Sequence, residues 1–222
     1  MKCKISASMM CCDFFDLAAQ VGALEESAVD YLHIDIMDGH FVPNLALGTD
    51  FIRQLKKHTS IPLDIHLMTD VPEKVVDWLS LDAGDIVAIH IESTAAPMPL
   101  LAKIRECGAS PYLVLNPDTS ITAAKPFLDA VDGLLVMAVF PGFAGQKMVE
   151  GSLDRIAEAR KMLDLAGKQM LEIAVDGNVS VENAQKMKAA GANIFVTGTS
   201  AVFRGRDIAA NVCAFREQVL LS

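Results

Sequence analysis

The sequence predicts a (β/α)8 barrel, or TIM barrel, that forms a single domain over residues 1–222. Short apolar runs alternate with longer helical patterns along the whole chain, and this alternation is typical of a parallel sheet. Several helix patterns end at a glycine directly before the next apolar run, for example at residues 107–109 and 190–196. Eight such units predict a closed barrel. An open doubly wound sheet is the alternative, but the GxGxxG turn that usually follows its first strand is missing.

The order of the elements follows from the apolar runs and from the residues that start and stop helices. Asp13 and Ser180 are expected to cap the first and seventh helices, because a side-chain oxygen there can accept a free backbone N–H. Strands are expected at residues 3–10, 31–37, 62–68, 85–92, 111–116, 133–139, 171–177 and 193–199. Helices are expected at residues 14–26, 50–57, 71–81, 97–107, 121–130, 149–165, 180–190 and 207–220.

Composition narrows the classes of partner. Hydrophobic residues make up 52% of the chain, enough for a large core, and the formal net charge of -9 argues against nucleic acid as a partner. No apolar run is long enough to cross a bilayer and no signal peptide is visible, so no membrane partner is expected. The five cysteines are odd in number and lack zinc-ribbon spacing, which favours reduced thiols and a cytoplasmic location.

The second predicted strand carries polar side chains where packing does not require them. Side chains alternate across a strand, so His33, Asp35 and Met37 share one face while Ile34 and Ile36 share the other. A buried His–Asp pair held by a hydrogen bond is one explanation, and a functional site is the other. The remaining strands decide between them.

Polar residues and methionines recur near the ends of other strands, mostly two positions apart. In a barrel, strand ends and the loops after them carry the active site, so several converging polar groups favour a site over isolated core polar groups. By contrast, His40 and His58 fall in a loop and at a helix end, and both are expected at the surface. The strand residues are Asp64, His66, Met68, His90, Glu92, Met137, Glu172 and Asp176.

Two histidines and two carboxylates among these residues form a candidate metal site: His33, Asp35, His66 and Asp176. Imidazole and carboxylate ligands suit a borderline divalent cation. One Zn²⁺ ion is favoured, and Fe²⁺, Mn²⁺ and Co²⁺ are alternatives.

Glycine-rich turns follow the last three strands, at residues 139–146, 177–178 and 198–200. Glycine lets backbone N–H groups approach an anion closely, and barrels often bind phosphate after strands seven and eight. Plain turns are the alternative, but three such turns on adjacent strands favour phosphate binding.

The residues therefore favour metal-assisted proton transfer on a phosphorylated sugar. No lysine is expected to point inward near a strand end, which disfavours Schiff-base chemistry. Asp35 and Asp176 could act on opposite faces of a carbon next to a carbonyl, which gives an epimerase, whereas proton transfer on one face gives an isomerase. A decarboxylase on the same barrel and a catalytically silent binding protein are the alternatives.

Five motifs resemble the ribulose-phosphate 3-epimerase family along nearly the whole chain: HIDIMDGHFVPN, DIHLM, PGFAGQ, VDG and GTS. The resemblance implies a (β/α)8 barrel that inverts C3 of a phosphorylated ketose, with His33, Asp35, His66 and Asp176 as metal ligands. It also implies that Asp35 accepts the proton and Asp176 donates one. The substrate contacts implied by the resemblance are Ser8, His66, Met37, Met68, Met137, Gly142, Phe143, Ala144, Gly145, Gly177, Asn178, Gly198, Thr199 and Ser200.

The chain departs from the family pattern at Ala7, Phe140, Ala144 and Asn178, in the loops around the expected substrate site. The segments MMCCD, HFVPNLAL, FAGQ and GTS are more similar to the D-allulose-6-phosphate 3-epimerase branch, which slightly favours conversion of D-allulose 6-phosphate to D-fructose 6-phosphate. The alternative is D-ribulose 5-phosphate to D-xylulose 5-phosphate. The resemblance further implies a homo-oligomer, either a dimer or a hexamer.

Overall fold

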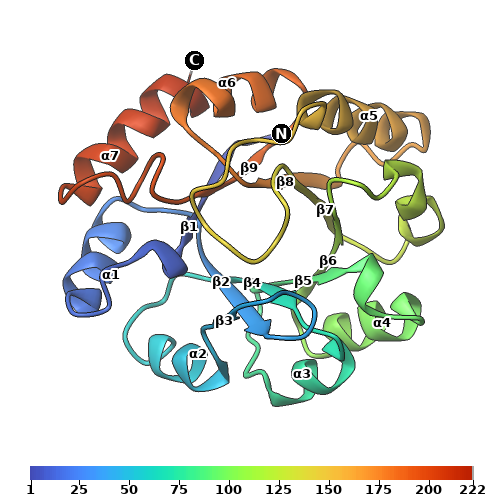
Figure 1. Cartoon of the computed structure of the whole chain (residues 1–222), viewed down its shortest axis with the longest axis horizontal. Helices are drawn as coiled ribbons and strands as arrows, with labels where there is room; N and C mark the ends of the chain where they lie inside the picture. The colour runs from blue at the N-terminus through green and yellow to red at the C-terminus, as the bar shows by residue number, and fades with distance from the viewer. Residues whose placement is uncertain (222) are drawn as a thin grey trace.

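A computed structural model describes residues 1–221 and contains a closed barrel of eight parallel strands inside a ring of helices (Figure 1). β1 pairs with both β2 and β9, and this closes the sheet. The predicted (β/α)8 barrel is confirmed, and the open sheet is excluded. The barrel strands are β1 (Lys4–Ser8), β2 (Tyr31–Asp38), β4 (Leu63–Met68), β5 (Ile86–His90), β6 (Ser110–Leu115), β7 (Gly133–Met137), β8 (Glu172–Asp176) and β9 (Ile194–Thr197).

One strand lies outside the barrel and was missing from the prediction. β3 (Leu45–Ala46) pairs antiparallel with the end of β2, so that Met37 lies opposite Ala46. A strand of two residues is too short to show an alternating pattern, so periodicity could not reveal it. It folds the loop after β2 back toward the barrel opening (Figure 1).

Within residues 1–221, seven α-helices cover the outside of the barrel: α1 (Leu17–Glu26), α2 (Thr49–Leu55), α3 (Pro72–Trp78), α4 (Pro97–Glu106), α5 (Ser152–Leu165), α6 (Val181–Ala189) and α7 (Ile208–Phe215). The connection between β6 and β7 is a 3₁₀ helix, Ile121–Phe127, rather than the predicted α-helix, and Pro126 inside it lacks the N–H that a longer helix needs. The last predicted helix is α7 followed by a π-helical turn, Arg216–Leu220. In the described part of the chain, no helix is long and apolar enough to span a membrane.

The two predicted caps behave differently. Ser180 accepts a hydrogen bond from the Asn183 N–H and caps α6, as predicted. The prediction for Asp13 was wrong: its carboxylate accepts from the Phe15 N–H in a local turn, and α1 begins only at Leu17. Aspartate favours such short turns as readily as helix caps, so its presence alone does not fix where a helix starts.

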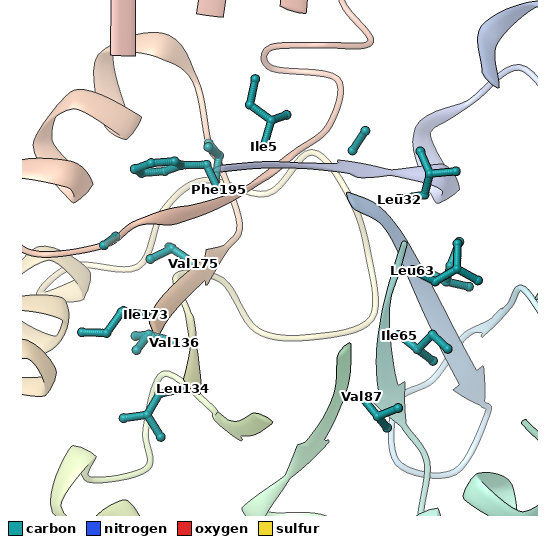
Figure 2. Packing of buried hydrophobic residues seen from close by; sticks show 14 of the residues in the cluster. Ile5, Leu32, Leu63, Ile65, Val87, Leu134, Val136, Ile173, Val175 and Phe195 are labelled. Atoms are coloured by element: carbon teal, nitrogen blue, oxygen red, sulfur yellow. The ribbon is translucent and has the colours of Figure 1, made fainter. Parts of the chain in front are cut away.

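Alternation along the strands divides the core into two regions. Side chains on the outer face of the barrel, such as Ile5, Ile65, Val136 and Phe195, are fully buried against the helices. Figure 2 shows these residues pointing away from the barrel axis. The inner face carries a smaller apolar cluster that includes Val114. It also carries buried polar residues predicted for the site, among them His33, Asp35 and His66. This outer core fixes the strands, so the inner side chains keep their relative positions.

The amino-terminal end of the barrel contains its own partly buried polar cluster, formed by Lys4, Tyr112 and Glu172. Lys4 Nζ lies 2.7 Å from Glu172 Oε1, and the Tyr112 hydroxyl donates to Glu172 Oε2 at 2.6 Å. Glu172 begins β8 whereas Asp176 ends it, so the expectation that both converge on one site was wrong. Lys4 points inward as well, but it begins β1 at the end of the barrel away from Asp176, so it does not bear on the expectation that no lysine points inward near the strand ends that carry the site.

Candidate active site

Two histidines and two aspartates meet at the carboxyl-terminal end of the barrel. Asp35 on β2 lies beside His66 on β4 in the sheet register, and Asp176 reaches the same point from the end of β8. His33 Nε2 is 3.3 Å from Asp35 Oδ1 and 3.9 Å from Asp176 Oδ2. His66 Nδ1 is 3.4 Å from Asp35 Oδ1 and 3.8 Å from Asp176 Oδ2. The structure therefore brings together the four residues expected to bind a metal.

The donor atoms of this group fit a single metal ion. One ligand atom from each of the four residues lies within 4.8 Å of the other three. His33 Nε2 and His66 Nδ1 are fully buried and have no hydrogen-bond partner, an arrangement that is costly unless another group binds them. Metal–ligand bonds of about 2.0–2.1 Å in a tetrahedral site imply ligand separations of roughly 3.4 Å, close to the shorter distances seen here. The four residues could thus hold one divalent cation.

Electrostatics in the site favour positive charge. Burial lowers the pKa of His33, but the carboxylates of Asp64 and Asp35 outweigh burial and hold that pKa well above its usual value. Burial raises the pKa of Asp35, yet His33 and His66 reverse the effect and the pKa of Asp35 is lowered. For Asp176, burial and the charge of Asp35 raise the pKa, although His33 opposes them. The potential that favours protonation of His33 also favours a bound cation.

Each histidine of the group has a buried partner on its other ring nitrogen. His33 Nδ1 lies 2.8 Å from Asp64 Oδ2, and Asp64 also accepts from the Ser6 hydroxyl at 2.8 Å. His66 Nε2 lies 2.8 Å from His90 Nε2. Asp64 and His90 were both predicted among the polar strand residues. Each contacts a candidate ligand through the ring nitrogen that does not face Asp35 and Asp176.

Apolar sulfur-containing side chains form one wall of the cavity above the four residues. Met37 and Met68 are neighbours across β2 and β4, and Met137 lies beside Asp176 across β7 and β8. All three methionines are at least 95% buried. Ser8 reaches the same cavity from β1 and donates to Asp35 Oδ2 at 3.2 Å. The methionines and Ser8 therefore line the predicted chamber.

The opposite wall is made by the three glycine-rich turns. All of the residues that the resemblance assigned to them line the same cavity: Gly142, Phe143, Ala144, Gly145, Gly177, Asn178, Gly198, Thr199 and Ser200. Among the described residues, no lysine or arginine lines this cavity. An anion there would be bound by backbone N–H groups and hydroxyls rather than by cationic side chains.

Two loops close part of the opening. The loop after β7 reaches across the barrel mouth, where it appears yellow in Figure 1. Asn44, in the loop after β2, donates from Nδ2 to the Gly142 carbonyl at 2.7 Å. Gln146 donates from Nε2 to the carbonyls of Phe140 and Phe143 at 2.7 and 2.8 Å. These bonds hold the loop in a fixed shape over the four-residue group.

A few residues of the site were not singled out from the sequence. Met10 and Cys11 line the cavity from a 3₁₀ turn, Met9–Cys11, at the end of β1. That segment was expected to remain strand to residue 10, and the turn is what moves Cys11 inward. His40 and His58 are exposed, as predicted, and neither lines the cavity.

Comparison with known proteins assigns this arrangement to a family. The model of the ribulose-phosphate 3 epimerase family matches residues 4–203. The chain belongs to the ribulose-phosphate 3-epimerase family. The predicted isomerase class is thereby confirmed at the level of the family, which is metal-dependent.

Curated relatives agree with this assignment over almost the whole chain. A ribulose-phosphate 3-epimerase from Bacillus subtilis is 37% identical over 204 residues, covering 92% of this chain and 94% of that protein. The chloroplast ribulose-5-phosphate-3-epimerase of Arabidopsis thaliana is 41% identical over 207 residues, covering 92% of this chain and 73% of that protein. Both names favour the pentose alternative over the allulose branch.

Solved structures with low identity share the fold alone. A 3-hexulose-6-phosphate synthase superposes with a TM-score of 0.66 at 16% identity, covering 97% of this chain and 99% of that one. The tryptophan synthase alpha-subunit of Pyrococcus furiosus gives a TM-score of 0.67 at 14% identity, with each chain covered completely. The barrel is therefore shared by enzymes of different names, and the reaction must be argued from the site.

Proposed function

We propose that this member of the ribulose-phosphate 3-epimerase family interconverts D-ribulose 5-phosphate and D-xylulose 5-phosphate with the help of one divalent metal ion, Zn²⁺ being favoured. The observation that carries the proposal is the convergence of Asp35 and Asp176, from β2 and β8, on one cavity beside two unpartnered histidine nitrogens. Two carboxylates on different strands can reach opposite faces of one substrate carbon, as inversion requires.

The ketose phosphate would bind with its phosphate against the glycine-rich wall and its C2–C3 segment beside the four-residue group. Backbone N–H groups of Gly177 and Gly198 are suited to the phosphate, since both residues line the cavity and carry no side chain that would separate the backbone from an anion. Met37, Met68 and Met137 would exclude water from the reacting carbons. This placement uses both walls of the cavity.

Asp35 removes the C3 proton from D-ribulose 5-phosphate, and Asp176 delivers a proton to the other face. In the protein without metal, the pKa of Asp35 is lowered, which favours its ionised, accepting form, and the pKa of Asp176 is raised, which favours the form that can donate. When bound, the divalent cation supplies positive charge that stabilises the enediolate oxygens. His33 and His66 would hold the cation, with Asp35 and Asp176 completing the ligand set.

Proton exchange in D₂O tests this function. Zn²⁺-loaded protein is incubated with D-ribulose 5-phosphate and, separately, with D-allulose 6-phosphate, and C3–H and product are followed by NMR. The proposal expects deuterium at C3 of the inverted pentose and faster turnover of the pentose than of the hexose. Faster turnover of the hexose would overturn the substrate assignment, and no exchange on either sugar would overturn the epimerase.

Variants of the two aspartates sharpen the test. In Asp176→Asn, Asp35 remains to exchange the C3 proton of D-ribulose 5-phosphate, but inversion should fall by at least 100-fold. In Asp35→Asn, exchange should persist only from D-xylulose 5-phosphate. Metal content is measured in each variant, because both side chains are also candidate ligands. Equal loss of exchange from both epimers in metal-loaded variants would contradict separate roles.

The cytoplasmic location and the homo-oligomeric state, dimer or hexamer, stay predictions that accompany this proposal.

A further inference from the structure

The two ring nitrogens of His66 face different surroundings. Nδ1 points toward Asp35 and Asp176 and has no hydrogen-bond partner. Nε2 lies 2.8 Å from Nε2 of His90, and both rings are fully buried. A hydrogen bond between two ring nitrogens requires that one carries the hydrogen and the other accepts it. The direction of this bond decides whether Nδ1 of His66 is free to bind a cation.

Glu92 determines that direction. His90 Nδ1 lies 3.3 Å from Glu92 Oε2, and an ionised carboxylate only accepts hydrogen bonds. His90 Nδ1 therefore carries the hydrogen, and a neutral His90 has an unprotonated Nε2 that must accept from His66. It follows that His66 carries its hydrogen on Nε2 and presents a bare Nδ1 to the two aspartates.

The surroundings hold this arrangement in place. Glu92 Oε1 accepts from the Asn116 N–H at 2.9 Å and from the Thr119 hydroxyl, so the carboxylate is tied to the end of β6. The ring of Phe41 packs against His90 with centroids 4.7 Å apart. Neither Glu92 nor His90 needs to touch a substrate to exert its effect.

The tautomer of His33 is fixed by a direct contact with a carboxylate. Its Nδ1 lies 2.8 Å from the carboxylate of Asp64, which fixes its hydrogen directly and leaves Nε2 bare. His66 lacks a carboxylate neighbour of this kind and receives the same constraint through a second imidazole. The two candidate ligands thus present different nitrogens because their supports differ.

We propose that His90 and Glu92 are positioning residues that hold His66 in the tautomer able to bind the metal through Nδ1. The proposal rests on the metal-dependent function proposed above, but it concerns metal affinity and histidine tautomer rather than turnover. A residue that orients a metal-bound histidine typically contributes about 10- to 100-fold to metal affinity or activity. This predicts a measurable effect from residues outside the cavity wall.

Glu92→Gln tests the proposal while keeping the shape of the side chain. The amide oxygen can still accept from Asn116 and Thr119, but its NH₂ then faces His90 Nδ1 and donates to it. His90 would reverse its tautomer and donate to His66 Nε2, which moves the His66 hydrogen to Nδ1. Glu25→Gln is the matched control, because Glu25 likewise accepts from a loop, at Thr59 and Ser60, far from the cavity.

Two measurements read out the effect without turnover. Long-range ¹H–¹⁵N spectra of metal-free, ¹⁵N-histidine-labelled protein resolve the tautomer of each of the 5 histidines. Competition between the protein and a chelating indicator gives the dissociation constant for Zn²⁺. We expect Nε2–H for His66 in the wild type and in Glu25→Gln, Nδ1–H in Glu92→Gln, and Zn²⁺ binding weakened about 10- to 100-fold in Glu92→Gln alone.

His90→Phe provides a second, independent variant, since it keeps an aromatic ring against Phe41 and removes both nitrogens. It too should weaken Zn²⁺ binding by about 10- to 100-fold. A wild-type His66 with its hydrogen on Nδ1, or unchanged Zn²⁺ affinity in both variants, would overturn the proposal. Wild-type protein that shows the expected tautomer and affinity but no C3 exchange would overturn the proposed function and leave this inference standing.

Discussion

Gly177 combines a restricted backbone angle with a close contact. Its φ is +113°, and a Cβ built there would lie 2.6 Å from Val139 Cγ2 and 2.8 Å from the Val139 N. Gly108 also has a positive φ, +90°, but nothing lies within 4 Å of a Cβ there. Substitutions at the two positions therefore separate the free-energy cost of the positive backbone angle from the cost of steric crowding.

Gly177→Ala is therefore expected to destabilise the protein more than Gly108→Ala. The backbone angle alone costs about 1–2 kcal/mol in either variant, and crowding at Gly177 adds about 1–3 kcal/mol. Urea unfolding measures the difference, and epimerisation of D-ribulose 5-phosphate should fall only in Gly177→Ala. Equal losses of unfolding free energy in the two variants would contradict the close approach at Gly177.

At the scale of single residues, alternation predicted which face a side chain occupies but not its height along the barrel. His33, Asp35 and His66 meet because neighbouring strands are staggered: His33 is only the third residue of β2, but it lies opposite Ser8 at the end of β1. Glu172 shares the inner face with Asp176 but begins the strand that Asp176 ends, about 13 Å away at roughly 3.3 Å per residue. Periodicity carries no information about that distance.

Among the elements, the loop after β7 receives two hydrogen bonds from one of its own side chains. The side chain of Gln146 donates to two of the loop's backbone carbonyls. The backbone carbonyl of Gln146 accepts from Asn178 Nδ2 at 2.7 Å. Gln146→Ala removes both side-chain bonds, each worth about 0.5–1.5 kcal/mol. We expect the KM for D-ribulose 5-phosphate to rise about 10-fold, with a smaller change in kcat, because the loop must be ordered on binding.

Gln169→Ala is the matched control for this loop. Gln169 also donates from Nε2 to a backbone carbonyl, that of Asp164, but it does not line the cavity. Steady-state kinetics and hydrogen exchange of residues 140–146 compare the two variants. If Gln146→Ala leaves both KM and loop exchange at wild-type values, the loop is held by other contacts.

Element types were more predictable than element ends. All eight barrel strands were found from their apolar runs, because strands buried on both faces need such runs. The start of α1 was misplaced because Asp13 forms a local turn, and the helix expected at 121–130 is 3₁₀ because Pro126 interrupts it. In both cases a local interaction outweighed the periodic pattern.

For the whole molecule, the two ends of the barrel have separate roles. The count of eight βα units predicted closure, but not the polar group at the amino-terminal end, since it joins residues distant in sequence. Lys4→Met would leave Glu172 with Tyr112 and Asn193 but without its cation. We expect a loss of about 1–2 kcal/mol in the free energy of unfolding and unchanged kcat/KM.

The double variant Lys4→Met/Glu172→Gln is the control for this pair. Removing the carboxylate charge as well should recover part of the lost stability, because no unpaired ion is then partly buried. Chemical denaturation of the single and double variants measures the coupling. A fall in kcat/KM in Lys4→Met would show that the two ends of the barrel are linked.

Metal binding is expected to stabilise the barrel as a whole, because the candidate ligands come from β2, β4 and β8. At free Zn²⁺ about 100 times its Kd, binding to the folded state adds about 2.7 kcal/mol, which corresponds to a rise in Tm of roughly 5–10 °C for a chain of this size. Thermal unfolding after chelation and after Zn²⁺ addition measures the shift. His66→Ala is the control and should respond little, as should the wild type with Mg²⁺, which prefers oxygen ligands. Equal Zn²⁺ shifts in wild type and His66→Ala would place the stabilising ion elsewhere.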